Sequence, residues 1–281
     1  MLRLSAFADE ISPDLDVQIE HCRRHGVSHI ELRGVNKINV LDFDPALRAE
    51  VRAKLADAGM GVVAIGSPIG KVKIDQPFAD HLDRYKIAVE LAQYFEAPFI
   101  RLFSYYPAEG QSAEDFVANH RDEVIDRMRR KVALIENLDV TLVHENESHI
   151  YGDTGDRCLD LIESVDSPRL RNAFDFANFV QIGDDPRVNW PRLKPHTVHI
   201  HIKDALREGG KVVPAGEGDG HLPEILKDAW DSGYRGFLSL EPHLQMAGRM
   251  QGFSGPERFG EAVRALRKVC EEQGIPLVPP G

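Results

Sequence analysis

Short apolar runs alternate along the chain with longer segments in which apolar residues recur every three or four positions. The short runs have the length and composition of buried strands, and the longer segments have the spacing of helices that cover a core. Gly and Pro separate the two kinds of segment, as Gly26 and Gly59 do after the first two helical segments. We therefore expect strands over residues 2–8, 27–32, 61–65, 98–103, 140–145, 170–175, 197–202 and 236–241.

The helical segments fall between these strands. Capping signals such as Asp44-Pro45 begin several of them, and the connection around 185–191 is less regular. Eight strands that alternate with helices, without a break in composition, predict a single (β/α)8 TIM barrel that forms one domain over residues 1–281. We expect the helices over 15–25, 45–58, 78–95, 121–138, 156–165, 223–232 and 256–272.

The last four predicted strands each end in a residue that can bind a metal. These residues are Glu145, Asp175, His201 and Glu241, on consecutive and therefore neighbouring strands. Active sites of TIM barrels lie at the carboxyl ends of the strands, so we expect the four side chains to converge there. Three carboxylates and one imidazole suit Mn²⁺, Mg²⁺ or Co²⁺, whereas zinc more often takes more nitrogen or sulfur.

Side-chain alternation sorts the neighbours of these residues, because positions two apart share one face of a strand. His199 is expected one layer below His201, as a core group or as its partner. His144 is expected to point outward, or to lie where the strand has already ended. Glu31 and Arg101 should face the barrel interior, where either a mutual buried pair or a place at the mouth fits the pattern.

Charge and composition narrow the class of protein. A net charge of −11 argues against non-specific binding to nucleic acid or to anionic membranes. The three cysteines are far apart, which favours buried thiols in a reducing compartment, and no stretch resembles a signal peptide or a membrane span. We expect a cytoplasmic protein. The basic residues of the 121–138 helix are interpreted as ordinary solvent-exposed surface: Arg127, Arg129, Arg130 and Lys131.

Several motifs together resemble the sugar phosphate isomerase/epimerase family, within the xylose isomerase-like TIM barrel superfamily that also contains ketose 3-epimerases and endonuclease IV. The resemblance covers essentially the whole chain and implies one divalent cation, Mn²⁺ before Mg²⁺ or Co²⁺, on the four residues named above. It also implies that Glu145 and Glu241 act as an acid/base pair. The motifs are Glu31-Leu32-Arg33-Gly34, residues 65–70, His144-Glu145-Asn146-Glu147 with residues 151–154, residues 174–179, His201-Ile202-Lys203-Asp204, residues 214–220, and residues 239–243.

The resemblance is incomplete at one position. Ketose 3-epimerases usually carry His three residues after the aspartate, where this chain has Asn178, which can hydrogen-bond a hydroxyl but cannot titrate.

Gly66, Gly70 and Lys71 form a small loop whose composition is weak evidence for anion binding, so a neutral substrate is only slightly favoured over a phosphorylated one. The candidate substrate-binding residues are Lys203, Asn178, His243, Arg207, Ser67 and Glu217.

These residues predict a metal-dependent isomerase or epimerase that acts on a small keto sugar or sugar derivative. The metal would stabilise an enediolate while the two glutamates remove and return a proton. The alternative is a metal-dependent lyase that eliminates an aglycone from a 3-keto-glycoside. A non-catalytic sugar-binding protein and an endonuclease IV-like hydrolase fit less well, and the oligomeric state is left open.

Overall fold

The computed structural model describes residues 1–245 and 252–279. Within them, eight parallel strands close into a barrel in the order β1-β12-β9-β8-β7-β6-β5-β2. All eight predicted strands are confirmed, although several are shorter than expected at one or both ends. The strands are β1 (Arg3–Ala6), β2 (His29–Leu32), β5 (Gly61–Ile65), β6 (Phe99–Leu102), β7 (Thr141–Glu145), β8 (Leu170–Asp175), β9 (Thr197–Ile202) and β12 (Phe237–Leu240).

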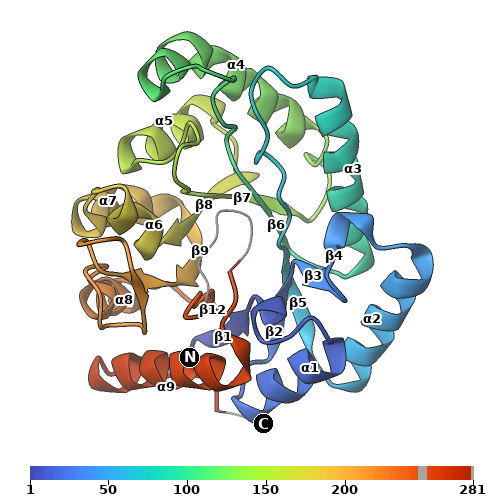
Figure 1. The fold of residues 1–281 in the computed structure, drawn as a ribbon, viewed down its shortest axis with the longest axis vertical. Coiled ribbons are helices and arrows are strands. Elements are labelled where there is room, and N and C mark those ends of the chain that lie inside the picture. Colours follow the sequence, from blue (N-terminus) through green and yellow to red (C-terminus); the bar gives the residue numbers. More distant parts are fainter. Residues whose placement is uncertain (246–251, 280–281) are drawn as a thin grey trace.

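The helices form a ring outside the barrel (Figure 1). Short polar side chains begin many of them: Asp14, Asp44 and Thr154 each accept a hydrogen bond from a backbone N–H of the first turn. The helices are α1 (Leu15–Arg24), α2 (Pro45–Asp57), α3 (Phe78–Tyr94), α4 (Ala113–Ala133), α5 (Gly155–Val165), α6 (Phe176–Gln181), α7 (Pro186–Leu193), α8 (Leu222–Asp231) and α9 (Gly255–Glu272).

The structure differs from the predicted helices in two places. Helix α4 begins at Ala113, eight residues before the expected start, because Ser112 Oγ accepts a hydrogen bond from Asp115 N. The irregular connection after β8 contains the two helices α6 and α7. Two short hairpins, β3 (Gly34–Val35) with β4 (Ile38–Asn39) and β10 (Asp204–Ala205) with β11 (Val212–Val213), lie in the loops that follow β2 and β9.

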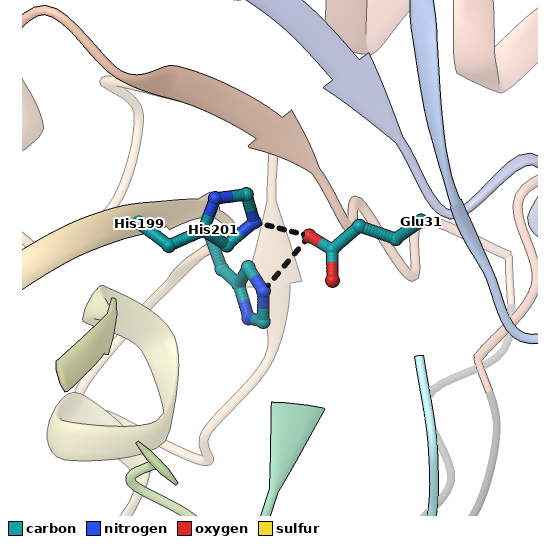
Figure 2. A group of neighbouring side chains, drawn as sticks. All are labelled: Glu31, His199 and His201. Carbon is teal, nitrogen blue, oxygen red and sulfur yellow. Dashed lines mark hydrogen bonds and ion pairs between the residues drawn. The ribbon is translucent and has the colours of Figure 1, made fainter. Parts of the chain in front are cut away.

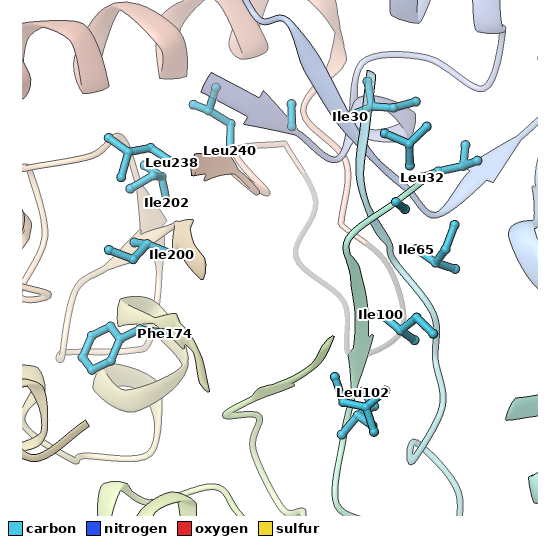
Figure 3. Close-up of a cluster of buried hydrophobic side chains, with 14 of the residues drawn as sticks. Ile30, Leu32, Ile65, Ile100, Leu102, Phe174, Ile200, Ile202, Leu238 and Leu240 are labelled. Carbon is cyan, nitrogen blue, oxygen red and sulfur yellow. The ribbon is translucent and has the colours of Figure 1, made fainter. Parts of the chain in front are cut away.

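The main hydrophobic core lies between the strands and the helices. Alternate strand residues such as Ile30, Leu32 and Ile100 point outward to the helices and are fully buried there (Figure 3). The residues between them face the barrel interior, and at the carboxyl ends of the strands many of these are charged. The strand period of two thus separates an apolar layer outside the barrel from a polar interior.

The prediction of a solvent-exposed basic face on α4 is wrong for two of its four residues. Lys131 is 0% exposed and Arg127 is 8% exposed. Lys131 Nζ donates to the Tyr105 hydroxyl at 2.6 Å, and burial together with the charge of Arg127 lowers the pKa of this lysine to about 7. Both side chains lie on the face of α4 that packs against Tyr105 in the loop after β6, since the Arg127 guanidinium lies 5.1 Å from the centroid of the Tyr105 ring.

Two further expectations concern the state of the cysteines and the absence of a membrane span. Cys22, Cys158 and Cys270 are all free and buried, as expected. Of the helices in residues 1–245 and 252–279, none combines the length and the apolar character needed to cross a bilayer. Leu277, near the end of the described residues, forms a parallel bridge with Leu2, beside the start of β1.

Candidate metal and proton-transfer site

The four predicted metal ligands meet at the carboxyl ends of β7, β8, β9 and β12. Glu145, Asp175 and His201 are the last or next-to-last residues of their strands, and Glu241 directly follows β12. One potential ligand atom from each of the four lies within 4.8 Å of the others, and all four side chains are buried. Parallel pairing accounts for this convergence, because β7, β8, β9 and β12 are neighbours in that order and their carboxyl ends lie at the same end of the barrel.

Two asparagines hold the Asp175 end of this cluster. The Asn146 side chain donates to Asp175 O and accepts from Asp175 N, both at 3.0 Å, so it joins the ends of β7 and β8. Asp175 Oδ1 caps α6 by accepting from Asn178 N at 2.8 Å. This cap leaves Oδ2 directed away from the helix. The Asn178 amide donates to Asn146 O at 2.7 Å and lies 3.4 Å from Glu145 Oε1, so Asn178 contacts one of the four predicted ligands.

Three cations surround the carboxylates of the cluster. Arg101 Nη1 lies 3.1 Å from Glu145 Oε2 and 3.6 Å from Glu241 Oε1, so it bridges the two glutamates. Lys203 Nζ lies 3.0 Å from Asp175 Oδ2 and 3.3 Å from Glu241 Oε2. Arg33 Nη1 lies 3.2 Å from Glu241 Oε1. Both guanidinium groups stack on the ring of Phe7, each 4.6 Å from its centroid.

These charges set the protonation of the two glutamates. Burial raises the pKa of Glu145, but the charges of His201 and Arg101 outweigh it and lower this pKa to about 2. Burial opposes ionisation of Glu241 too, and Lys203, His243 and His201 hold its pKa well below the usual range. The pKa of Asp175 rises to about 6 because burial outweighs the charge of Lys203. Glu145 and Glu241 are therefore ionised at neutral pH, and each can accept a proton.

His201 has a carboxylate on both sides of its ring. Its Nδ1 lies 3.3 Å from Glu145 Oε1, and its Nε2 lies 3.0 Å from Glu31 Oε1. His199 Nε2 reaches the same Glu31 oxygen at 2.6 Å (Figure 2). Glu31 therefore pairs with imidazoles rather than with Arg101, and of the two arrangements left open for these residues the mutual pair is excluded. Burial opposes ionisation of Glu31, but His201 and His199 hold its pKa well below normal.

The other predicted site residues lie at varying distances from the cluster. His243 joins it, with Nε2 3.5 Å from Glu241 Oε1 and 3.1 Å from Glu10 Oε1. Ser67 is buried and donates to Arg101 O at 2.5 Å. Arg207 is exposed and donates to Gly183 O, and Glu217 is exposed in the loop before α8. Arg207 and Glu217 therefore remain predictions that the described contacts do not connect to the cluster.

The hydrogen bonds of two further segments bear on their sequence interpretation. His144 is fully buried, and its Nε2 is 3.0 Å from Ser104 Oγ, which also accepts from Gly152 N. The loop of Gly70 and Lys71 has its polar groups engaged, since Gly70 N donates to His81 and Lys71 Nζ lies 2.9 Å from Glu147. This loop consequently offers less to an anion than its composition indicated.

Several residues around the cluster were not predicted as part of the site. Arg33 and Asn146 stood in the quoted motifs without a role, and Asp9 and Glu10 follow β1. Asp9 Oδ2 accepts from Arg33 Nε at 2.8 Å, and Glu10 pairs with His243. All four residues lie just beyond the end of a strand. The four metal ligands were predicted from the same kind of position, so it could also have identified these residues.

The residues of the cluster fit a divalent cation. His201 Nδ1 is buried and makes no hydrogen bond among the described residues, although Glu145 Oε1 lies 3.3 Å away. Asp175 Oδ2 is likewise buried without a hydrogen bond, and Lys203 Nζ lies 3.0 Å from it. Buried polar atoms of this kind can bind a cation in place of these partners. Glu145, Asp175 and Glu241 supply oxygen and His201 supplies nitrogen, a donor set suited to a six-coordinate metal of the Mg²⁺ or Mn²⁺ type.

The comparisons with known proteins define the class to which this barrel and site belong. A model of the xylose isomerase-like TIM barrel family matches residues 19–269. The chain belongs to the xylose isomerase-like TIM barrel family, as its motifs indicated.

The individual proteins to which the chain is similar share a low sequence identity with it. A 3-dehydroshikimate dehydratase of Bacillus anthracis is 23% identical over 240 residues, which cover 79% of this chain and 83% of that protein. The structure of a D-tagatose 3-epimerase-like protein matches with a TM-score of 0.76 and 16% identity, covering 97% of this chain and 98% of the other. A family member from Mycobacterium smegmatis, in complex with magnesium, matches with a TM-score of 0.72 and 18% identity, covering 97% of both chains.

Proposed function

We propose that the protein is a divalent-metal-dependent isomerase or epimerase that acts on a keto sugar or sugar derivative. One observation carries this proposal: Glu145 and Glu241, from strands that are not neighbours, approach the same buried cluster and share Arg101. Two carboxylates that come from different strands of the barrel can reach a substrate carbon from two directions. Removal and return of a proton by such a pair is the step common to isomerisation and epimerisation.

Glu145, Asp175, His201 and Glu241 would hold the metal. When bound, a divalent cation withdraws electron density from a substrate carbonyl and makes the adjacent C–H more acidic. The magnesium complex of a relative supports a site for a hard cation, and Mn²⁺ stays a prediction.

The protein's own side chains transfer the proton and bind the substrate. Glu145 and Glu241 accept and return the proton through their carboxylate oxygens. His201 and Arg101 keep Glu145 ionised before the substrate arrives, and Lys203 and His243 keep Glu241 ionised. Lys203 and His243 flank Glu241 and can donate hydrogen bonds to substrate hydroxyls, and Asn178 can do so beside Glu145. Because Lys71 and Gly70 N–H already have partners, the structure favours a substrate without a phosphate at that loop.

Elimination is the second candidate, and it uses the same first step. After proton removal the electron pair can expel a β-oxygen as water or alcohol instead of taking the proton back. The dehydratase named among the relatives supports this outcome, and Lys203 or His243 can supply the proton that the leaving oxygen needs. The 3-keto-glycoside lyase predicted from the sequence belongs to this class of reaction.

The test measures the exchange of a substrate proton with solvent. Wild-type protein with Mn²⁺ or Mg²⁺ in deuterium oxide should incorporate deuterium next to the carbonyl of at least one compound among free ketoses, ketose phosphates, 3-keto-glucosides and 3-dehydroshikimate. NMR of the product separates reprotonation from elimination. Glu145→Gln and Glu241→Gln should each lower the rate by about 10²–10⁴-fold. Glu163→Gln, an exposed change on α5, should leave it unaltered. A lack of exchange in every compound with the metal-loaded protein would contradict the proposal.

A further inference from the structure

His201 is the one imidazole of the proposed metal set, and its two ring nitrogens face opposite directions. Nδ1 lies 3.3 Å from Glu145 Oε1 and 3.8 Å from Glu241 Oε2, on the side of the cluster. Nε2 lies 3.0 Å from Glu31 Oε1. Glu31 comes from β2, three strands away from β9 around the barrel, and reaches His201 through the interior (Figure 2).

One oxygen of Glu31 meets two imidazoles. Oε1 accepts from His199 Nε2 at 2.6 Å while it contacts His201 Nε2, and all three side chains are fully buried. An ionised carboxylate can only accept, so a ring nitrogen that pairs with it carries the proton. In His201 that places a proton on Nε2, and a cation bound among the other carboxylates would meet the ring at Nδ1, in place of the proton that Nδ1 shares with Glu145.

Packing limits rotation of this ring. The ring of Phe7 lies edge-on to His201, with centroids 5.3 Å apart and an interplanar angle of 79°. The ring of His199 lies 5.2 Å away at 89°. Ring flipping would need these neighbours to move, so the nitrogen that faces the cluster is fixed by packing as well as by charge.

We propose that Glu31 is a positioning residue for the metal site, with His199 holding it in place. Glu31 selects the protonated state of Nε2 and presents Nδ1 of His201 to the cation. Carboxylates that hold the distal nitrogen of a metal-binding imidazole raise its basicity and fix its orientation. The proposal rests on the proposed function in assuming that the four-residue cluster binds a divalent cation.

The experiment measures metal binding without turnover. Isothermal titration of full-length protein with Co²⁺ should give a Kd for Glu31→Gln that is about 10–100-fold weaker than for wild type. The visible absorption of bound Co²⁺ should change too, since the orientation of one ligand changes. His199→Asn should cause a smaller loss because the contact between Glu31 and His201 remains. Ser5→Ala, another buried interior position on β1, should bind like wild type.

Equal Kd and equal Co²⁺ spectra for wild type and Glu31→Gln would overturn the proposal. If Glu31→Gln does not fold, the wild-type protein provides the measurement. In the Zn²⁺-loaded form, ¹⁵N NMR of His201 should show a metal-bound Nδ1 and a protonated Nε2. A metal-bound Nε2 would refute the positioning role.

The outcomes also separate this proposal from the proposed function. Weakened Co²⁺ binding in Glu31→Gln, together with no proton exchange by wild type on any substrate, would reject only the isomerase. Turnover by a wild type whose Glu31→Gln variant binds metal normally would reject only the positioning role. A wild type that binds no divalent cation would reject both.

Discussion

Buried charges in this barrel are almost always neutralised by a neighbour. Arg101 pairs with Glu145 and Glu241, and Glu31 pairs with two imidazoles. Pairing is required because an ion without a partner loses its hydration and gains nothing in return. Lys131 differs, since its ammonium donates to the neutral Tyr105 hydroxyl.

Lys131 should therefore make stability depend on pH. Its folded pKa of about 7 is below the value of about 10.4 expected in the unfolded chain, so the unfolded state binds more protons between these values. The burial cost is complete below pH 7 and disappears as the pH approaches 10. Lys131→Met should thus stabilise the protein by about 1–4 kcal/mol at pH 6, with the gain shrinking at pH 9.5.

Urea unfolding of the wild type and of the variant at both pH values checks this prediction. Lys268→Met, an exposed change on α9, serves as the control and should show little effect at either pH. A gain from Lys131→Met that is the same at pH 6 and pH 9.5 would show that the lysine does not titrate in this range.

Single side chains also join neighbouring elements at the carboxyl end of the barrel. The Asn146 amide connects β7 to β8 by one donated and one accepted bond. Asp204, which follows β9, accepts from four backbone N–H groups: those of Ala205, Gly216, Gly218 and Gly220. A Cβ on Gly218 would lie 2.3 Å from Asp204 Oδ1, so this glycine is required for the loop to wrap around the carboxylate.

Asn146→Asp tests the link between the strands. Aspartate can accept from Asp175 N but cannot donate to Asp175 O, so a bond becomes a repulsion between two oxygens. We expect a loss of about 2 kcal/mol in the free energy of unfolding and weaker metal binding, measured by urea unfolding and by titration with Mn²⁺. Asn137→Asp, an exposed change after α4, should be neutral. A variant as stable as wild type would show that the backbone pairing of β7 and β8 suffices.

Asp204→Asn tests the loop before α8. An amide in this position turns an NH₂ group toward two of the four N–H donors, which should cost about 2 kcal/mol. Limited proteolysis should cut residues 206–221 faster than in wild type. Asp231→Asn, exposed at the end of α8, is the matched control. Unchanged cleavage in Asp204→Asn would argue that the loop is held by other contacts.

At the scale of the whole molecule, the barrel brings the ligands together and the ligands should in turn stabilise the barrel. We propose that residues 1–281 form one domain, which predicts a single unfolding transition. Because a divalent cation would bind four strands of the folded state, 100-fold excess over its Kd should add about 2.7 kcal/mol to stability. That corresponds to an increase in Tm of about 5 °C.

Differential scanning calorimetry with Mn²⁺, with Mg²⁺ and with a chelator measures both effects. The variant Asp175→Asn should lose most of the increase with metal. Two separate transitions would reject the single domain, and a Tm that does not depend on metal would count against the cation site.

The sequence by itself determined the barrel and the four residues proposed as metal ligands, because both depend on local patterns. Strand period places alternate residues such as Glu145 and His201 inside, and helical period places a helix between strands. The ends of consecutive strands then become neighbours through topology alone. Helix α4 shows a limit of apolar spacing as a predictor of helix boundaries, because its start depends on the cap at Ser112.

Only the tertiary structure decided which charges pair across the barrel. Glu31 lies 168 residues from His199 along the chain, and Arg101 lies 44 residues from Glu145. No local pattern specifies such partners, because they depend on the tilt of the strands and on the way that side chains fill the interior. Local sequence likewise predicted an exposed position for Lys131. Only the tertiary structure shows that the loop after β6 covers this side chain.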